Sequence, residues 1–185
     1  MRRAAVMWVF VVQRQADRLY DAVSEFNKAQ LDQYFLDQRE AGTLSDEWKS
    51  YVEDEVGSGM SWWVTWTVAA DQYFFLLAAA QLRKCVLRLP NDGLLPVPDS
   101  KMIRLLRNFT EHWENPSGTS AVELRELVPD AAPGRLVYTK KEVWIEGVSM
   151  FGIVDWARDV DRVLRANAAR TGEVLPNPVE PCPGA

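Results

Sequence analysis

The amino-acid sequence predicts a mainly α-helical protein, a bundle of about five helices with a small β-hairpin inserted. Long stretches carry apolar residues at helical spacing, and short segments rich in Gly and Pro separate them. Only residues 136–146 combine β-branched and aromatic residues with a polar turn. Because the chain has 185 residues and 48% of them are hydrophobic, we expect one domain with its own core over residues 1–172.

The first helix is expected over residues 4–40. Leu19 and Val23 belong to a set of apolar residues at helical spacing, and Gly42 ends the stretch. The apolar run 4–12 follows two arginines and superficially resembles a short signal peptide. It lacks a small-residue cleavage site and is too short to cross a bilayer. We therefore expect it to begin a core or interface helix in a cytoplasmic protein with no membrane partner.

Two further helices are expected before the first Pro-rich loop. Ser45 is suited to cap the second helix, which the segment 57–59 ends with two glycines. The longest apolar stretch, residues 61–89, then predicts a central helix, because it is apolar nearly all round. Its first two turns hold three tryptophans that we expect in the core or in a subunit interface: Trp62, Trp63 and Trp66.

The next helix is expected over residues 101–114, after a loop with two prolines. Asp99 or Ser100 is suited to cap its N-terminus, and Pro116 follows its end. A short helical segment over 121–127 comes next, bounded by prolines. This part of the chain therefore predicts two helices of unequal length, joined by a tight connection.

The C-terminal part changes character twice. Residues 136–138 and 143–145 are short apolar runs on either side of a polar turn, which indicates a β-hairpin over 136–146. A last helix is expected over 150–169, with apolar residues on one side. The tail, 173–185, contains four prolines and is expected to be disordered.

Charge and cysteine content exclude several classes of function. The net charge is −5, so the chain lacks the overall positive charge with which proteins grip long nucleic acids, and any contact with RNA would have to be local. Cys85 lies in an apolar helical stretch and Cys182 in the tail, without the spacing of metal ligands or of a disulfide framework. With a single His beside them, we expect no zinc site and no cofactor.

The chemically most suggestive segment is the helix over 101–114. It holds the only histidine, His112, whose unperturbed pKa suits a proton carrier near neutral pH. Asn108 shares a helix face with His112, whereas Arg107 lies about 140° away around the helix. One straight helix therefore does not aim Arg107 and His112 at the same point, unless it bends or a second copy of the helix takes part.

A local excess of positive charge accompanies this segment. Between Gln81 and Asn108, the sequence has six basic residues and two acidic ones. An acidic protein can thus still form one basic cleft. Besides Arg107, the residues expected to bind a phosphate-bearing substrate are Arg83, Lys84, Lys101 and Arg104.

The string Arg107-Asn108-Phe109-Thr110-Glu111-His112 resembles the signature of HEPN domains, an Arg followed by a polar residue, a short spacer and a His. The preceding aromatic and Ala-rich helix is also similar, so the resemblance covers about residues 60–170. It implies a bundle of four to five helices that forms a homodimer, in which two motifs meet in one cleft and cut RNA without a metal. The β-hairpin and the long N-terminal region depart from that pattern.

The resemblance implies a role for each residue of the motif. His112 would transfer protons, Arg107 would hold the phosphate, and Asn108 would orient His112 or the phosphate. Only RNA would be cut, because DNA lacks the attacking 2′-hydroxyl. In this first hypothesis the protein is a toxin or defence effector, held in check by a partner such as an antitoxin protein.

Two other interpretations use the same residues. In the second, the bundle is a dimeric interaction module that binds RNA or a nucleotide without cutting it. In the third, the motif is a coincidence in a structural helical protein, with Arg107 and Glu111 forming an ordinary surface ion pair at i,i+4.

Overall fold

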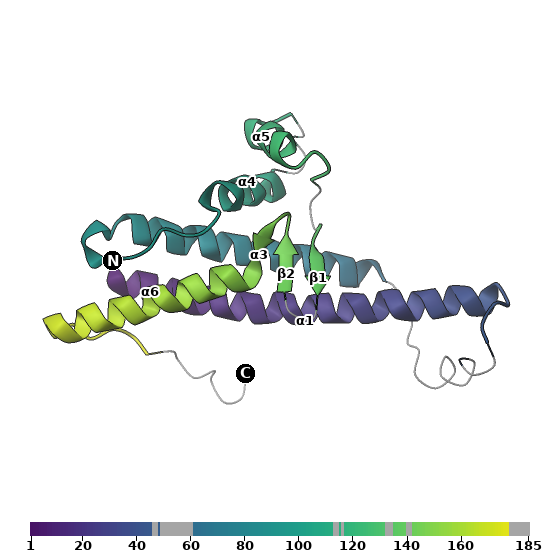
Figure 1. The fold of residues 1–185 in the computed structure, drawn as a ribbon, viewed down its shortest axis with the longest axis horizontal. Helices are drawn as coiled ribbons and strands as arrows, with labels where there is room; N and C mark the ends of the chain where they lie inside the picture. The colour runs from purple at the N-terminus through teal and green to yellow at the C-terminus, as the bar shows by residue number, and fades with distance from the viewer. Residues whose placement is uncertain are drawn as a thin grey trace.

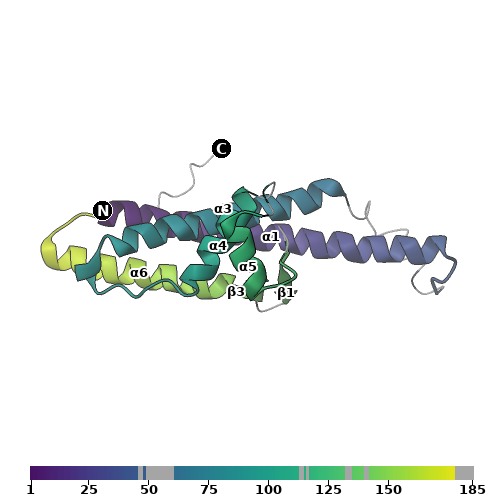
Figure 2. The ribbon, with the colours of Figure 1, turned by 90° about the horizontal axis from the view of Figure 1, so that it is seen from above.

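In the computed structural model, the described part of the chain comprises residues 1–45, 48, 61–112, 115, 117–131, 135–139 and 142–177. It contains five α-helices, one 3-10 turn and a three-stranded sheet, which confirms the mainly α-helical prediction. Two long helices, α1 (Arg2–Glu40) and α3 (Trp62–Leu87), run antiparallel along the molecule, and α6 (Met150–Thr171) lies beside the N-terminal half of α1 (Figures 1 and 2). The second helix expected after Ser45 falls almost entirely outside the described residues.

The two halves of α1 differ in how much they are covered. From Arg2 to Val23 the helix is packed by both α3 and α6, and its apolar side is buried. The buried residues of this half are Ala5, Val6, Val9, Val12, Ala16, Leu19, Ala22 and Val23. The first apolar run is thus part of the core, as expected. Beyond Val23, α1 extends past α6, and in this second half of α1 Asp32 is the one buried residue.

Helix α3 contributes most of its buried surface through its middle and C-terminal parts. Phe75, Leu76 and Leu82 are fully buried in the hydrophobic core. Cys85 is buried near the C-terminal end, and burial raises the pKa of its thiol. Among the helices that the structure describes, none combines the length and the apolar character that a bilayer crossing requires.

Helix α4 (Ser100–Glu111) packs on α3, and α5 (Thr119–Leu127) packs on α4 (Figure 1). α4 ends at Glu111 rather than at the expected residue 114, because the backbone of His112 leaves the helical region at φ −124° and ψ 40°. The expected cap is also absent. Asp99 stands at the N-cap in the left-handed region, φ 52°, and its side chain makes no capping hydrogen bond.

The expected hairpin is confirmed, and the structure extends it by a third strand. β1 (Val137–Thr139) pairs antiparallel with β2 (Glu142–Ile145), and β2 pairs antiparallel with β3 (Val148–Ser149). The third strand has only two residues, too few for a period-two pattern. The sheet is joined directly to α6, because the Ser149 hydroxyl caps that helix by accepting a hydrogen bond from Gly152 N–H at 2.8 Å.

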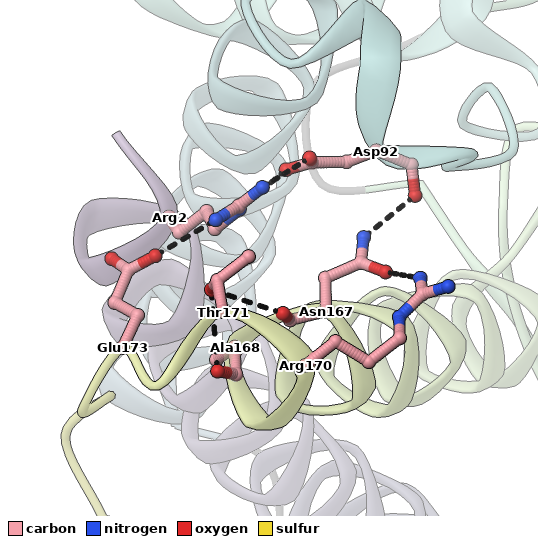
Figure 3. Close-up of polar contacts among 7 residues, drawn as sticks. All are labelled: Arg2, Asp92, Asn167, Ala168, Arg170, Thr171 and Glu173. Atoms are coloured by element: carbon pink, nitrogen blue, oxygen red, sulfur yellow. Dashed lines mark hydrogen bonds and ion pairs between the residues drawn. The ribbon is translucent and has the colours of Figure 1, made fainter.

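A polar cluster, here called the terminal clasp, ties the chain's ends to the η1 turn (Pro90–Asp92) (Figure 3). The Arg2 guanidinium donates to both carboxylate oxygens of Asp92, at 2.9 and 2.7 Å, and to Glu173 at 2.9 Å. Asn167 Nδ2 donates to the Asp92 backbone oxygen at 2.9 Å. The clasp consists of Arg2, Asp92, Asn167 and Glu173.

The clasp includes part of the segment predicted to be disordered. Glu173 forms an ion pair with Arg2, and Leu175 packs against the hydrophobic core. The beginning of this segment is therefore ordered, contrary to the prediction. Residues 178–185 of the predicted tail lie outside the described residues.

Candidate functional site

Helix α4, which packs between α3 and α5, carries the predicted motif. Its buried face carries Ile103, Leu105, Leu106 and Phe109. The intervening positions therefore direct Arg104, Arg107 and Asn108 away from the core. This strong division between an apolar and a polar face fixes the helix rotation, and with it the directions in which the motif residues point.

Arg107 lies in a cavity of about 260 Å³ between α3 and α4, together with Arg83, Lys84 and Arg104. Three of the four predicted substrate-binding residues thus gather beside Arg107. Lys101, the fourth, is exposed on α4 and does not line this cavity. The structure therefore brings together two pairs of basic residues that are 20 to 24 positions apart in the sequence, in the way a phosphate-binding cleft requires.

Acidic residues neutralise part of this positive charge. Arg107 forms an ion pair with Glu111, with Nη2 and Oε2 2.5 Å apart, on the next turn of α4. Arg104 pairs with Glu123 of α5 at 2.8 Å. A phosphate that entered the cavity would compete with two carboxylates for these guanidinium groups, which lowers the affinity that the basic residues alone would give.

His112 stands at the C-cap of α4, where its backbone N–H donates to the Asn108 carbonyl at 3.0 Å. Its exposed side chain lines a second cavity of about 150 Å³, between the end of α4 and the beginning of α5. Thr119, Ser120 and Ala121, the first residues of α5, line the same cavity. The first N–H groups of a helix have no partner within the helix, and the helix dipole favours an anion there.

Asn108 separates the two cavities and lines both of them. Its side-chain oxygen accepts from Arg107 Nη1 at 3.2 Å, and its Nδ2 donates to Ser120 Oγ at 3.2 Å. These two bonds fix the Asn108 amide between Arg107 and the start of α5. The arrangement makes Asn108 a link between the two cavities.

Arg107 and His112 do not converge within one chain, because each lines a different cavity. This agrees with the angle of about 140° that helical geometry gives for two positions five residues apart. The sequence reasoning missed Ser120 and the N-terminus of α5. The signal for them was present, since Pro116 and Gly118 mark the start of a new helix close to His112 in the sequence.

No family model matches the chain, and neither a curated protein nor a solved structure is significantly similar to it. The resemblance to HEPN domains therefore rests on the motif residues and the helical architecture, and it stays a prediction.

Proposed function

We propose that this protein is a metal-independent endoribonuclease of HEPN type, in which two copies of the chain complete the cleavage site. One observation carries the proposal: a proton-transferring imidazole and a group of four basic residues lie in adjacent cavities that share Asn108. Imidazole and guanidinium are the two groups that metal-free RNA cleavage needs.

In the proposed reaction, the 2′-oxygen of a ribose attacks the adjacent phosphorus and the bond from phosphorus to the 5′-oxygen breaks. A base removes the proton of the 2′-hydroxyl, and an acid protonates the leaving 5′-oxygen. The products carry a 2′,3′-cyclic phosphate and a 5′-hydroxyl. His112 supplies proton transfer, and Arg107 stabilises the charge that develops on the phosphate oxygens.

A second copy is needed because the two groups line separate cavities in one chain. We propose that Arg107 of one copy acts with His112 of the other across a shared cleft. In the RNA complex, the phosphate displaces Glu111 from Arg107, exchanging one charge-assisted contact for another. The N-terminus of α5 beside His112 offers a second place for a neighbouring phosphate.

Cleavage of single-stranded RNA in the presence of a chelator tests the proposal. Wild type is expected to cut, and both His112→Ala and Arg107→Ala are expected to lose at least about 100-fold in rate, the usual contribution of a proton-transferring group. Arg158→Ala removes an exposed arginine on α6 and serves as the matched control with unchanged rate. RNA with 2′-O-methyl groups must resist cutting. A wild-type protein that leaves RNA intact contradicts the proposal.

Mixing the two inactive variants tests the shared cleft. A mixed dimer of His112→Ala with Arg107→Ala retains one site with both groups intact, so the mixture is expected to cut faster than either variant alone. A mixture as inactive as its components contradicts the pairing of Arg107 and His112 across copies.

A second candidate function is favoured by the ion pair between Arg107 and Glu111. A paired guanidinium in a cavity apart from the imidazole suits a module that binds RNA or a nucleotide without cutting it. In that case, RNA binds with an affinity that falls in Arg83→Ala and Arg107→Ala, and the bound RNA stays intact. The toxin or defence role, and restraint by an antitoxin protein, belong to the first candidate only.

A further inference from the structure

The outward face of α3 carries an apolar stripe, here called the α3 stripe. Its members lie within about 120° of one another around the helix and opposite the buried face that includes Val68, Phe75 and Leu82. They continue over four turns from the start of the helix. The α3 stripe consists of Trp62, Trp63, Trp66, Ala70, Tyr73, Phe74 and Leu77.

The largest side chains of the stripe are exposed in the single chain. Trp62, Trp63 and Trp66 have exposed fractions of 70%, 65% and 62%, and Phe74 has 44%. Of the two places expected for these tryptophans, the core is therefore wrong, and the subunit interface stays a prediction. They stand at the end of α3 that extends past α6 and the sheet, where α1 covers only one side of the helix (Figure 1).

The exposed members of the stripe form a large apolar patch. Because a large aromatic side chain presents about 150–250 Å², the four most exposed members leave roughly 500 Å² of apolar surface in contact with water. Ala70, Tyr73 and Leu77 add to it. The total falls short of the ~800 Å² that each partner buries in a standard interface, and it lies in the upper part of the roughly 300–600 Å² range of the largest apolar patch on a monomer, a patch that often serves binding.

The stripe carries no charge. From Trp62 to Leu82, Asp71 is the one residue in the sequence that is an Asp, Glu, Lys, Arg or His. Asp71 is buried on the opposite face, where it pairs with Arg18 of α1 at 3.0 Å. Two such stripes can therefore meet without burying an unpaired charge, the cost that most often prevents a surface from pairing with itself.

Charge also disfavours other occupants. The stripe lacks the Lys and Arg residues with which a base-stacking surface holds the RNA backbone. The adjoining end of α1, residues 25–40, has four acids against two bases, a net charge of −2, and would be repelled by an anionic membrane. We infer that the α3 stripe is a self-association surface, on which a second copy of this chain lays its own α3 stripe.

This contact is isologous, since the same patch serves on both copies. Two-fold symmetry then closes the assembly at a dimer, with the aromatic ends of the two α3 helices buried against each other. The inference uses no residue of the two cavities on either side of Asn108. It shares with the proposed function only the presence of a second copy: mixing the two inactive variants tests the shared cleft, whereas the mass of the Trp66 variants tests the α3 stripe.

Light scattering coupled to size-exclusion chromatography, and sedimentation velocity, test the surface on the full chain. At about 50 µM, above the micromolar dissociation constants of weak interfaces of this size, wild type is expected to have twice the 21.1 kDa mass of the chain. Trp66→Glu is expected to weaken the dimer by about 30-fold or more, the effect of losing a central Trp anchor. Trp66→Phe keeps the surface apolar and is expected to remain dimeric.

The matched control is Leu95→Glu, which introduces the same charge at a residue of similar exposure, 66%, away from α3. This variant is expected to remain a dimer. Circular dichroism verifies that Trp66→Glu keeps its helix content, and Trp63→Glu repeats the test at the neighbouring anchor. A monomeric wild type, or a dimer that persists in both glutamate variants, overturns the inference. A monomer that binds phosphatidylcholine vesicles or polyuridine through Trp66 would also overturn it, because the α3 stripe would then be a lipid-binding or RNA-binding surface.

Discussion

The two ends of α1 show how one helix takes on two different roles. At the end near Arg2, the helix is packed between α3 and α6, and the terminal clasp fastens it to η1 and to the end of α6 (Figure 3). At the other end, near Glu40, α1 extends past both α6 and the N-terminal end of α3 (Figure 1), and large side chains such as Leu31 and Tyr34 remain half exposed. The covered half is also the more apolar: 14 of the 22 residues from Arg2 to Val23 are hydrophobic, against 6 of the 17 from Ser24 to Glu40. Composition and the number of packing neighbours therefore act together in deciding which half becomes core.

The largest expected effect separates two leucines of the same helix. Leu19 is fully buried and Leu31 is 50% exposed. Leu19→Ala is expected to lower the free energy of unfolding by about 3 kcal/mol, because the lost contacts leave a cavity. Leu31→Ala is expected to cost less than about 1 kcal/mol. Urea denaturation measures both, and equal losses would show that the two halves of α1 are equally well packed.

A smaller effect is expected at the terminal clasp. Arg2→Met removes the cation that pairs with the carboxylate of Asp92, whose side chain is only 7% exposed. The variant is expected to be less stable than wild type at neutral pH, by less than Leu19→Ala, because Arg2 itself is accessible to water. Arg3→Met, at the exposed neighbouring position, is the control and is expected to match wild type.

The stability contributed by the clasp should depend on pH in one direction. The hydrogen bonds from Arg2 lower the pKa of Asp92 below its usual value of 3.8. Because the ionised carboxylate is favoured in the folded state, its contribution is complete above the unfolded-state pKa and is lost as the pH falls through the lower folded-state pKa. The difference in unfolding free energy between wild type and Arg2→Met should therefore shrink below about pH 4. A constant difference down to pH 2 would rule out Asp92 as its source.

The smallest effect concerns reactivity and leaves stability unchanged. Burial raises the pKa of the Cys85 thiol and shields it from reagents. In a Cys182→Ser background, Cys85 is expected to react with a thiol reagent at least about tenfold more slowly than a cysteine introduced by Leu31→Cys. In urea, both thiols should react at the same rate. Rapid reaction of Cys85 in the folded protein would mean that the covered end of the molecule opens readily.

The helices were predictable because their signals are local. Periodic apolar residues placed α1, α3 and α6 within a few residues of their observed ends. The end of α4 was misplaced because the backbone of His112 departs from the helix at a residue with no sequence signal for a stop. The two-residue strand β3 was missed because its pairing with β2 is a tertiary contact rather than a local preference.

The residues of the candidate site could be predicted from the sequence, but their arrangement in space could not. The basic residues and His112 were found from residue type, and helical geometry showed that Arg107 and His112 diverge. No pattern of residues indicated that Asn108 stands between two cavities, or that Ser120 accepts a hydrogen bond from it. Both facts depend on how α5 packs against α4.

The amino-acid sequence alone was enough to show that this chain forms long amphipathic and apolar helices, and that Arg107, Asn108 and His112 follow one another within one short segment. Those features follow from side-chain chemistry and a period of 3.6 residues. Only the tertiary structure decided which apolar faces are covered, because burial depends on how many neighbours a segment receives. It left the tryptophans of α3 in contact with water and divided the motif between two cavities.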